Sequence, residues 1–159
     1  MSEDSTVDQT RDQPTEPNPA LGALDVLVGT WQISGRESGP EGEIHGESRF
    51  EWMEGGFYLL QHVNMNHLGH EIRGIEYIGH DPAADNLHSY FFGTEAPGPF
   101  AGVALEYVYE VTDETITIWG GEVGSPAAYK GRFENGRNKI TGAWGWPGGG
   151  YEATMTRAG

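Results

Sequence analysis

Hydrophobic segments of strand length recur along almost the whole of this chain, separated by turn sequences. Several of them alternate between apolar and polar residues, as where Leu105, Tyr107, Tyr109 and Val111 alternate with Glu106 and Glu110. Such period-2 alternation is typical of strands with one buried and one solvated face. No apolar pattern of helical period interrupts these segments, which argues against parallel strands joined by helices. The spacing therefore predicts a single closed antiparallel sheet.

Ten strands are expected, with turn pairs such as Gly55-Gly56 and Asn135-Gly136 between them. We predict an all-β fold, a ten-stranded antiparallel up-and-down barrel. The expected strands lie near residues 29–36, 44–53, 57–66, 70–79, 87–93, 103–111, 115–120, 127–134, 138–146 and 150–157.

The start of the chain differs in composition from the rest. Residues 1–19 contain no aromatic residue, several prolines and an excess of acids, which predicts a disordered acidic tail. Residues 20–28 place Leu21, Leu24 and Leu27 at helical spacing and end at Gly29. We expect a short N-terminal helical plug at one end of the barrel, within a folded domain of residues 20–159.

Composition excludes several classes of function. The 159 residues include no cysteine, so disulfides, thiolate nucleophiles and Cys-ligated zinc are excluded. The formal net charge of −15 argues against partners such as nucleic acid or an anionic membrane surface, which attract Lys and Arg. The sequence contains neither a signal-peptide pattern nor an apolar run of about 18 residues, so we expect a cytoplasmic protein.

The hairpins at Gly55-Gly56 and Leu68-Gly69 predict which side chains share the interior. If both loops have an even length, Phe50 pairs with Gln61 and Gln61 pairs with Glu76. A carboxylate and an amide would then lie side by side inside the barrel. The prediction inverts if either loop has an odd length, because a slip of one residue turns every side chain to the other face.

The same register leaves apolar side chains on the outside of neighbouring strands. Monomers rarely expose so large an apolar patch, so we expect a homodimer formed sheet to sheet. The outward residues are Tyr58, Leu60, Ile75, Tyr77, Tyr90 and Phe92.

Several strand and turn motifs resemble those of a calycin-like, or lipocalin-like, family of bacterial β-barrel proteins known only as a domain of unknown function. The motifs are residues 27–31 (LVGTW), 48–53 (SRFEWM), 55–59 (GGFYL), 79–82 (GHDP), 142–144 (GAW) and 155–157 (MTR). The resemblance covers residues 24–157 and implies a calycin-like barrel.

The resemblance also implies roles for two residues at the barrel base. In lipocalins the first-strand tryptophan is covered by a basic residue from the end of the barrel, and Trp31 and Arg157 occupy the matching places. Their implied role is barrel closure, by a guanidinium stacked on an indole.

The wider superfamily includes nitrobindin-like barrels, which ligate haem through a histidine late in the chain. This chain has no histidine after His88, so that motif is absent. His67 and His70 flank a turn, but the third ligand that zinc requires is not evident. We expect no cofactor and no metal site, and we keep haem binding and a purely structural dimeric barrel as alternatives.

The inward aromatic side chains, with only one or two polar groups among them, predict a module that binds a small apolar or aromatic molecule inside the barrel. Aromatic side chains would supply contact area, while Gln61 and Glu76 would orient the ligand. The alternative is a barrel enzyme that uses Glu76 for acid–base chemistry, since burial raises the pKa of a carboxyl group. A surface Glu76, or one merely satisfied by Gln61, is the competing structural interpretation. The expected ligand-binding residues are Phe50, Trp52, Gln61, Glu76, Phe91, Tyr107, Tyr109 and Trp144.

Overall fold

A computed structural model describes residues 15–37, 42–67, 69–93 and 104–158 of the chain. In this part of the chain a 3-10 helix, η1 (Pro19–Leu27), precedes ten strands. The strands are β1 (Gly29–Arg36), β2 (Glu43–Trp52), β3 (Leu59–His67), β4 (His70–Asp81), β5 (Asn86–Gly93), β6 (Ala104–Val111), β7 (Thr115–Gly120), β8 (Ala128–Glu134), β9 (Lys139–Trp146) and β10 (Gly149–Arg157). Of the expected acidic tail, residues 1–14 lie outside the described residues.

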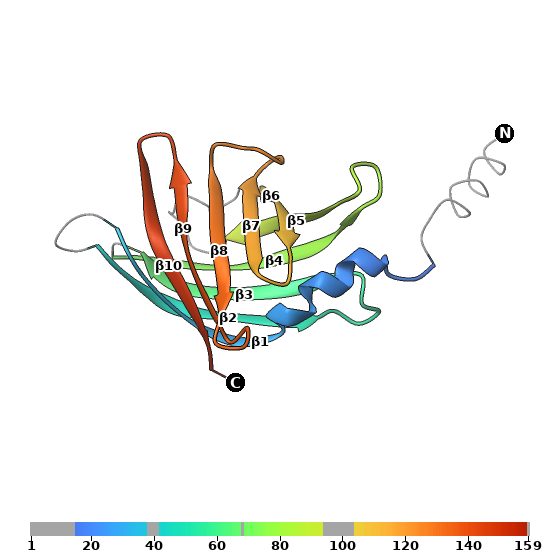
Figure 1. Ribbon diagram of the computed structural model, residues 1–159, viewed down its shortest axis with the longest axis horizontal. Helices are drawn as coiled ribbons and strands as arrows, with labels where there is room; N and C mark the ends of the chain where they lie inside the picture. The colour runs from blue at the N-terminus through green and yellow to red at the C-terminus, as the bar shows by residue number, and fades with distance from the viewer. Residues whose placement is uncertain (1–14, 38–41, 68, 94–103, 159) are drawn as a thin grey trace.

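The strands close into a barrel in which each strand pairs with the next in chain order (Figure 1). β10 returns to pair antiparallel with β1, from Trp31 opposite Arg157 to Arg36 opposite Glu152. The predicted all-β, ten-stranded, antiparallel up-and-down barrel is therefore confirmed among the described residues. Within those residues, no helix is both long and apolar enough to cross a membrane.

η1 closes the end of the barrel at which β1 begins. Its side chains Leu21, Leu24 and Leu27 are buried and belong to the same core cluster as inward residues of the strands. Asn18 caps the helix, since its side-chain oxygen accepts a hydrogen bond from Ala20 N at 2.9 Å. The hydrophobic core is thus concentrated at the η1 end of the barrel.

The turns before and after β3 keep the predicted register. Phe50 lies opposite Gln61 across β2 and β3, and Gln61 lies opposite Glu76 across β3 and β4. β3 begins at Leu59, two residues later than expected, because Gly55 and Gly56 form a turn at φ values of 96° and 78°. The loop is longer than a two-residue turn, but its length is still even. The interior pairing is therefore confirmed.

An outer apolar face covers adjoining parts of β3, β4 and β5. Tyr58, Tyr90 and Phe92 are 46%, 44% and 47% exposed. Tyr77 packs edge-on against Phe92 with ring centres 6.1 Å apart. These three exposed rings, with half-buried Leu60, Ile75 and Tyr77, are called the outer apolar face below.

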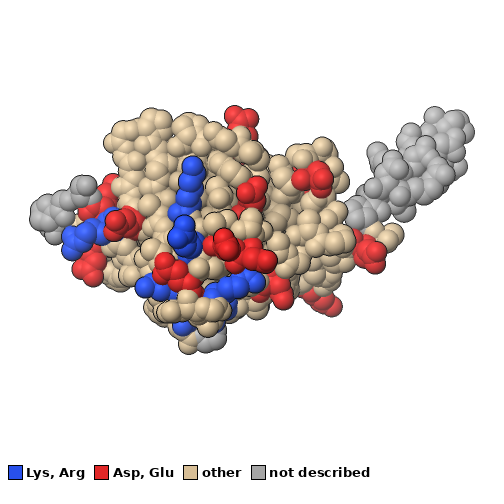
Figure 2. Space-filling view, in the orientation of Figure 1, with Lys and Arg blue, Asp and Glu red and all other residues tan. Residues whose placement is uncertain are grey.

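Charged side chains are unevenly distributed on the face seen in Figure 2. Acidic and basic groups lie next to one another over its lower part, while the surface over the upper ends of β8, β9 and β10 is largely uncharged. Trp146, the last residue of β9, is 38% exposed.

Candidate functional site

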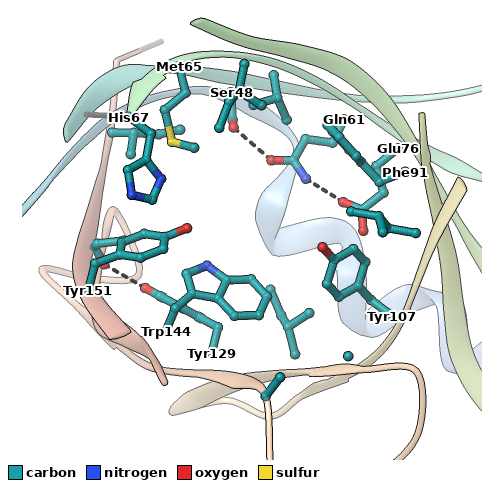
Figure 3. A pocket seen from close by; sticks show the side chains of 18 of the residues that line it. Ser48, Gln61, Met65, His67, Glu76, Phe91, Tyr107, Tyr129, Trp144 and Tyr151 are labelled. Carbon is teal, nitrogen blue, oxygen red and sulfur yellow. Dashed lines mark hydrogen bonds between the residues drawn. The ribbon is translucent and has the colours of Figure 1, made fainter. Parts of the chain in front are cut away.

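A cavity of about 620 Å³ occupies the barrel between the core and the end opposite η1 (Figure 3). Its walls are inward side chains, most of them aliphatic or aromatic, because alternate residues of every strand point to the interior. The aromatic residues that line it are Phe91, Tyr107, Tyr109, Tyr129, Trp144, Trp146 and Tyr151.

Glu76, on β4, is the centre of a hydrogen-bonded network in the cavity wall, and only 3% of its surface is exposed. Its Oε1 accepts hydrogen bonds from Gln61 Nε2 at 2.5 Å and from the Tyr109 hydroxyl at 2.7 Å. Its Oε2 accepts a hydrogen bond from Ser89 Oγ at 2.5 Å. Three donors thus converge on one buried carboxylate.

A second serine extends the network through the amide of Gln61. Ser48 Oγ donates to Gln61 Oε1 at 2.7 Å, and Gln61 Nε2 on the other side of the amide donates to Glu76. The Glu76 network therefore consists of Ser48, Gln61, Glu76, Ser89 and Tyr109, which come from β2, β3, β4, β5 and β6 in turn. Neighbouring strands supply it because the barrel is up-and-down.

Burial and hydrogen bonding act on the pKa of Glu76 in opposite directions. Removal from water raises it, the three donated hydrogen bonds lower it, and the net direction is upward. Burial, together with the charge of Glu76, raises the pKa of Tyr107 to about 12 and that of Tyr109 well above its ordinary value. Both phenols therefore stay neutral at physiological pH and keep the O–H group that can donate a hydrogen bond.

Three aromatic rings form a corner of the cavity opposite part of this network. The Trp144 ring lies 5.8 Å from that of Tyr107 and 5.7 Å from that of Tyr129, in edge and tilted contacts. Tyr129 is held by a hydrogen bond from its hydroxyl to Ala153 O at 2.9 Å. In Figure 3 the Tyr107 hydroxyl, the Tyr151 hydroxyl and the indole nitrogen of Trp144 point toward the open space. Within the described residues these three groups have no hydrogen-bond partner.

The structure brings six of the eight expected ligand-binding residues to the cavity wall, namely Gln61, Glu76, Phe91, Tyr107, Tyr109 and Trp144. Phe50 and Trp52 lie outside it. Phe50 is buried in the core, and Trp52 packs against that core and donates from Nε1 to Asp25 Oδ1 at 2.9 Å. Both lie near the end of β2 that η1 covers, so the expected site shifts toward the opposite end of the barrel.

Other lining residues were not anticipated. Ser48 could have been found, because it is two residues from Phe50 and therefore shares its inward face. Ser89, which bonds Glu76 but does not line the cavity, could have been found in the same way, because it is two residues from Phe91. The alternation of Tyr129 and Phe133 with Lys130 and Arg132 marks Tyr129 as inward, but its place in the cavity wall depends on how the barrel closes.

At the base of the barrel, the structure places Arg157 against Trp31. The Arg157 guanidinium carbon lies 4.3 Å from the centre of the Trp31 ring, which is fully buried. Arg157 Nη1 and Nη2 donate to Val28 O and Val26 O, both at 2.6 Å. This pair lies at the η1 end and is separate from the cavity wall.

The histidine pair expected at the β3–β4 turn is described only in part, because the His70 side chain lies outside the described residues. His67 lines the cavity near the end opposite η1, and its Nε2 lies 2.9 Å from Glu37 Oε2. In the part of the chain that the structure describes, no group of three His, Asp or Glu side chains is arranged to hold a metal ion.

Comparison of the chain with protein-family models and with curated proteins found no match. The fold and the site together define a class: a closed up-and-down β-barrel with one plugged end and an apolar interior cavity containing a buried carboxylate.

Proposed function

We propose that this chain is a calycin-like binding barrel that holds a small, largely apolar or aromatic molecule in its interior. The observation that supports this proposal is the cavity of about 620 Å³, walled by aliphatic and aromatic side chains with one buried polar network. Binding pockets for small molecules have volumes of about 300–1,000 Å³ and contain a few placed polar groups in an apolar wall. The cavity has this anatomy.

The barrel's construction supports the calycin-like assignment. An arginine at the end of the last strand covers the tryptophan of the first strand, as the lipocalin resemblance implies for Arg157 and Trp31. η1 fills the same end, so a ligand enters from the opposite end. There the corner formed by Tyr107, Tyr129 and Trp144 offers flat apolar surfaces to a ring.

The experiment uses a matched pair of substitutions on β3. Val63 lines the cavity, whereas its neighbour Asn64 is exposed on the outside. Val63→Trp should fill the space and abolish the fluorescence enhancement of the neutral probe N-phenyl-1-naphthylamine, while Asn64→Trp should keep it. Circular dichroism checks that both variants fold, and Met65→Trp offers a second way to fill the cavity.

Two results would count against binding. One is a wild-type protein that neither enhances the probe nor carries a co-purified small molecule in native mass spectra from its own host. The other is a folded Val63→Trp variant that binds the probe as well as the wild type does.

An acid–base enzyme is the second candidate, and the burial of Glu76 favours it. Burial raises the pKa of this carboxyl group, as general acid–base catalysis near neutral pH requires. Turnover of a bound compound that disappears in Glu76→Gln, while binding of that compound persists, would support this candidate. If the wild type binds the compound but does not turn it over, the enzyme candidate is refuted and the binding function stands.

We also propose that two copies of the chain associate through the outer apolar face. Tyr58, Tyr90 and Phe92 are exposed there, and the Phe92 ring packs against half-buried Tyr77. Burial of this face in a symmetric dimer would remove it from water.

A further inference from the structure

The cavity has an unusual charge balance for a site that holds a small molecule. Among the described residues that line it, none is Lys or Arg, and His67 is near the end opposite η1. The acidic residues are Glu76, deep in the wall, and Glu106, whose side chain is 53% exposed. Within the described residues, no positively charged side chain forms an ion pair with Glu76.

The hydrogen bonds around Glu76 are suited to its ionised form. An ionised carboxylate only accepts hydrogen bonds, and Gln61, Ser89 and Tyr109 all donate to it. Ser48 donates to the oxygen of the Gln61 amide, and the NH2 group of that amide donates to Glu76. The network therefore suits a negative charge on Glu76. Burial disfavours that charge, and among the described residues no cation is paired with it.

A ligand can supply the missing cation. A carboxylate has about four lone-pair sites, and three of those on Glu76 are occupied. The Tyr107 hydroxyl has no hydrogen-bond partner among the described residues, and in Figure 3 it faces the same part of the cavity as Glu76. An ammonium group placed there could donate both to the carboxylate and to the phenolic oxygen.

The surrounding rings favour the same kind of ligand. Tyr107, Tyr129 and Trp144 present aromatic surface to the cavity, and cations are attracted to the faces of such rings. The formal charge of −15 on the whole chain raises the local concentration of cations around it.

We propose that the cavity selects an organic cation, a small amine with an apolar or aromatic body, whose ammonium group binds between Glu76 and Tyr107. This inference rests on the proposed binding function and specifies its ligand class.

The test compares three probes that share one ring system and differ in charge: 1-naphthylmethylamine, 1-naphthalenemethanol and 1-naphthoate. Isothermal titration calorimetry at pH 7 should show the amine binding at least about tenfold tighter than the alcohol, because a hydrogen bond to a charged partner is stronger than a neutral one. The carboxylate should bind most weakly, because Glu76 repels it.

Variants then locate the source of this preference. Glu76→Gln should bring the amine to within about threefold of the alcohol, because only the charged ligand loses its partner. Glu110→Gln is the matched control, since it removes an exposed carboxylate of β6 that does not line the cavity, and it should keep the full preference. Tyr107→Phe should weaken amine binding more than alcohol binding, and it disturbs no hydrogen bond of the Glu76 network.

Tyr107→Phe keeps the test informative if Glu76→Gln does not fold. Equal affinities for amine and alcohol, or an unchanged preference in folded Glu76→Gln or in Tyr107→Phe, would overturn the cation inference and leave the binding function standing. Binding of none of the three probes, together with failure of the neutral probe and of the native mass spectra, would overturn the binding function itself.

Discussion

Arg157 stacks on Trp31 with its guanidinium carbon 4.3 Å from the ring centre, which joins the last strand of the barrel to the first. The same guanidinium donates to Val26 O at the end of η1 and to Val28 O just after it. Trp31 Nε1 donates to Leu27 O at 2.8 Å. One pair of side chains therefore holds together the barrel seam and the plug at its base.

Arg157→Ala should lower the free energy of unfolding by about 2–3 kcal/mol, because it removes a cation–π contact and the hydrogen bonds to η1. Arg157→Lys should lie between this variant and the wild type, since it keeps the charge but loses the planar donor fork. Urea denaturation measures all three. Arg132→Ala, at an exposed position on β8, is the control. Equal stability of the two alanine variants would contradict the closing role.

Gly142→Ala should destabilise the protein because the Tyr129 ring lies over this glycine. An added Cβ would come within 2.8 Å of Tyr129 Cζ and 2.4 Å of the backbone oxygen of Lys130. We expect the free energy of unfolding to fall by about 1–3 kcal/mol. Probe binding should also weaken, because Tyr129 lines the cavity. Gly145→Ala on the same strand is the control, since its Cβ would meet no atom within 4 Å. Thermal melts in which both variants behave alike would refute the expectation.

The stability of the free protein should depend on pH through Glu76. Its pKa in the folded state is raised above the ordinary value of 4.5, mainly by burial. A group of this kind contributes its full stabilisation below the unfolded-state pKa, and that contribution is lost as the pH rises through the folded-state pKa. The unfolding free energy of the wild type relative to Glu76→Gln should therefore fall as pH rises above about 4.5. Urea titrations from acid to neutral pH would refute this if the difference stayed constant or grew.

The wild type should be a dimer at micromolar concentration, and Tyr90→Glu should yield monomers by placing a charge within the outer apolar face. Tyr58→Glu should act in the same way. Multi-angle light scattering measures the mass, and Thr156→Glu, at an exposed position on β10, controls for added charge. A monomeric wild type, or a dimeric Tyr90→Glu variant, would refute the proposed association.

The alternation of side chains and the even length of two turns were sufficient to predict the interior pairing of Gln61 with Glu76. Both properties are local: successive residues of a strand point to opposite faces, and a hairpin transmits that parity to the next strand. The same logic predicted which aromatic residues would be exposed on the outer apolar face.

Position along the barrel axis was decided by the tertiary structure. Phe50 and Trp52 have the same inward parity as Gln61, but the leucines of η1 fill the barrel at their level, so they pack in the core. Parity specifies a face and carries no information about depth.

The tertiary structure also determined which hydrogen-bond donors meet at Glu76. Tyr109 is 33 residues away from it, and the hydroxyl reaches the carboxylate across β5 because the barrel curves its strands around a common interior. The sequence by itself determined the strands, their faces and the register of the early hairpins, since these depend on neighbouring residues. Only closure of the sheet and insertion of η1 decided where the interior is filled and where it stays open.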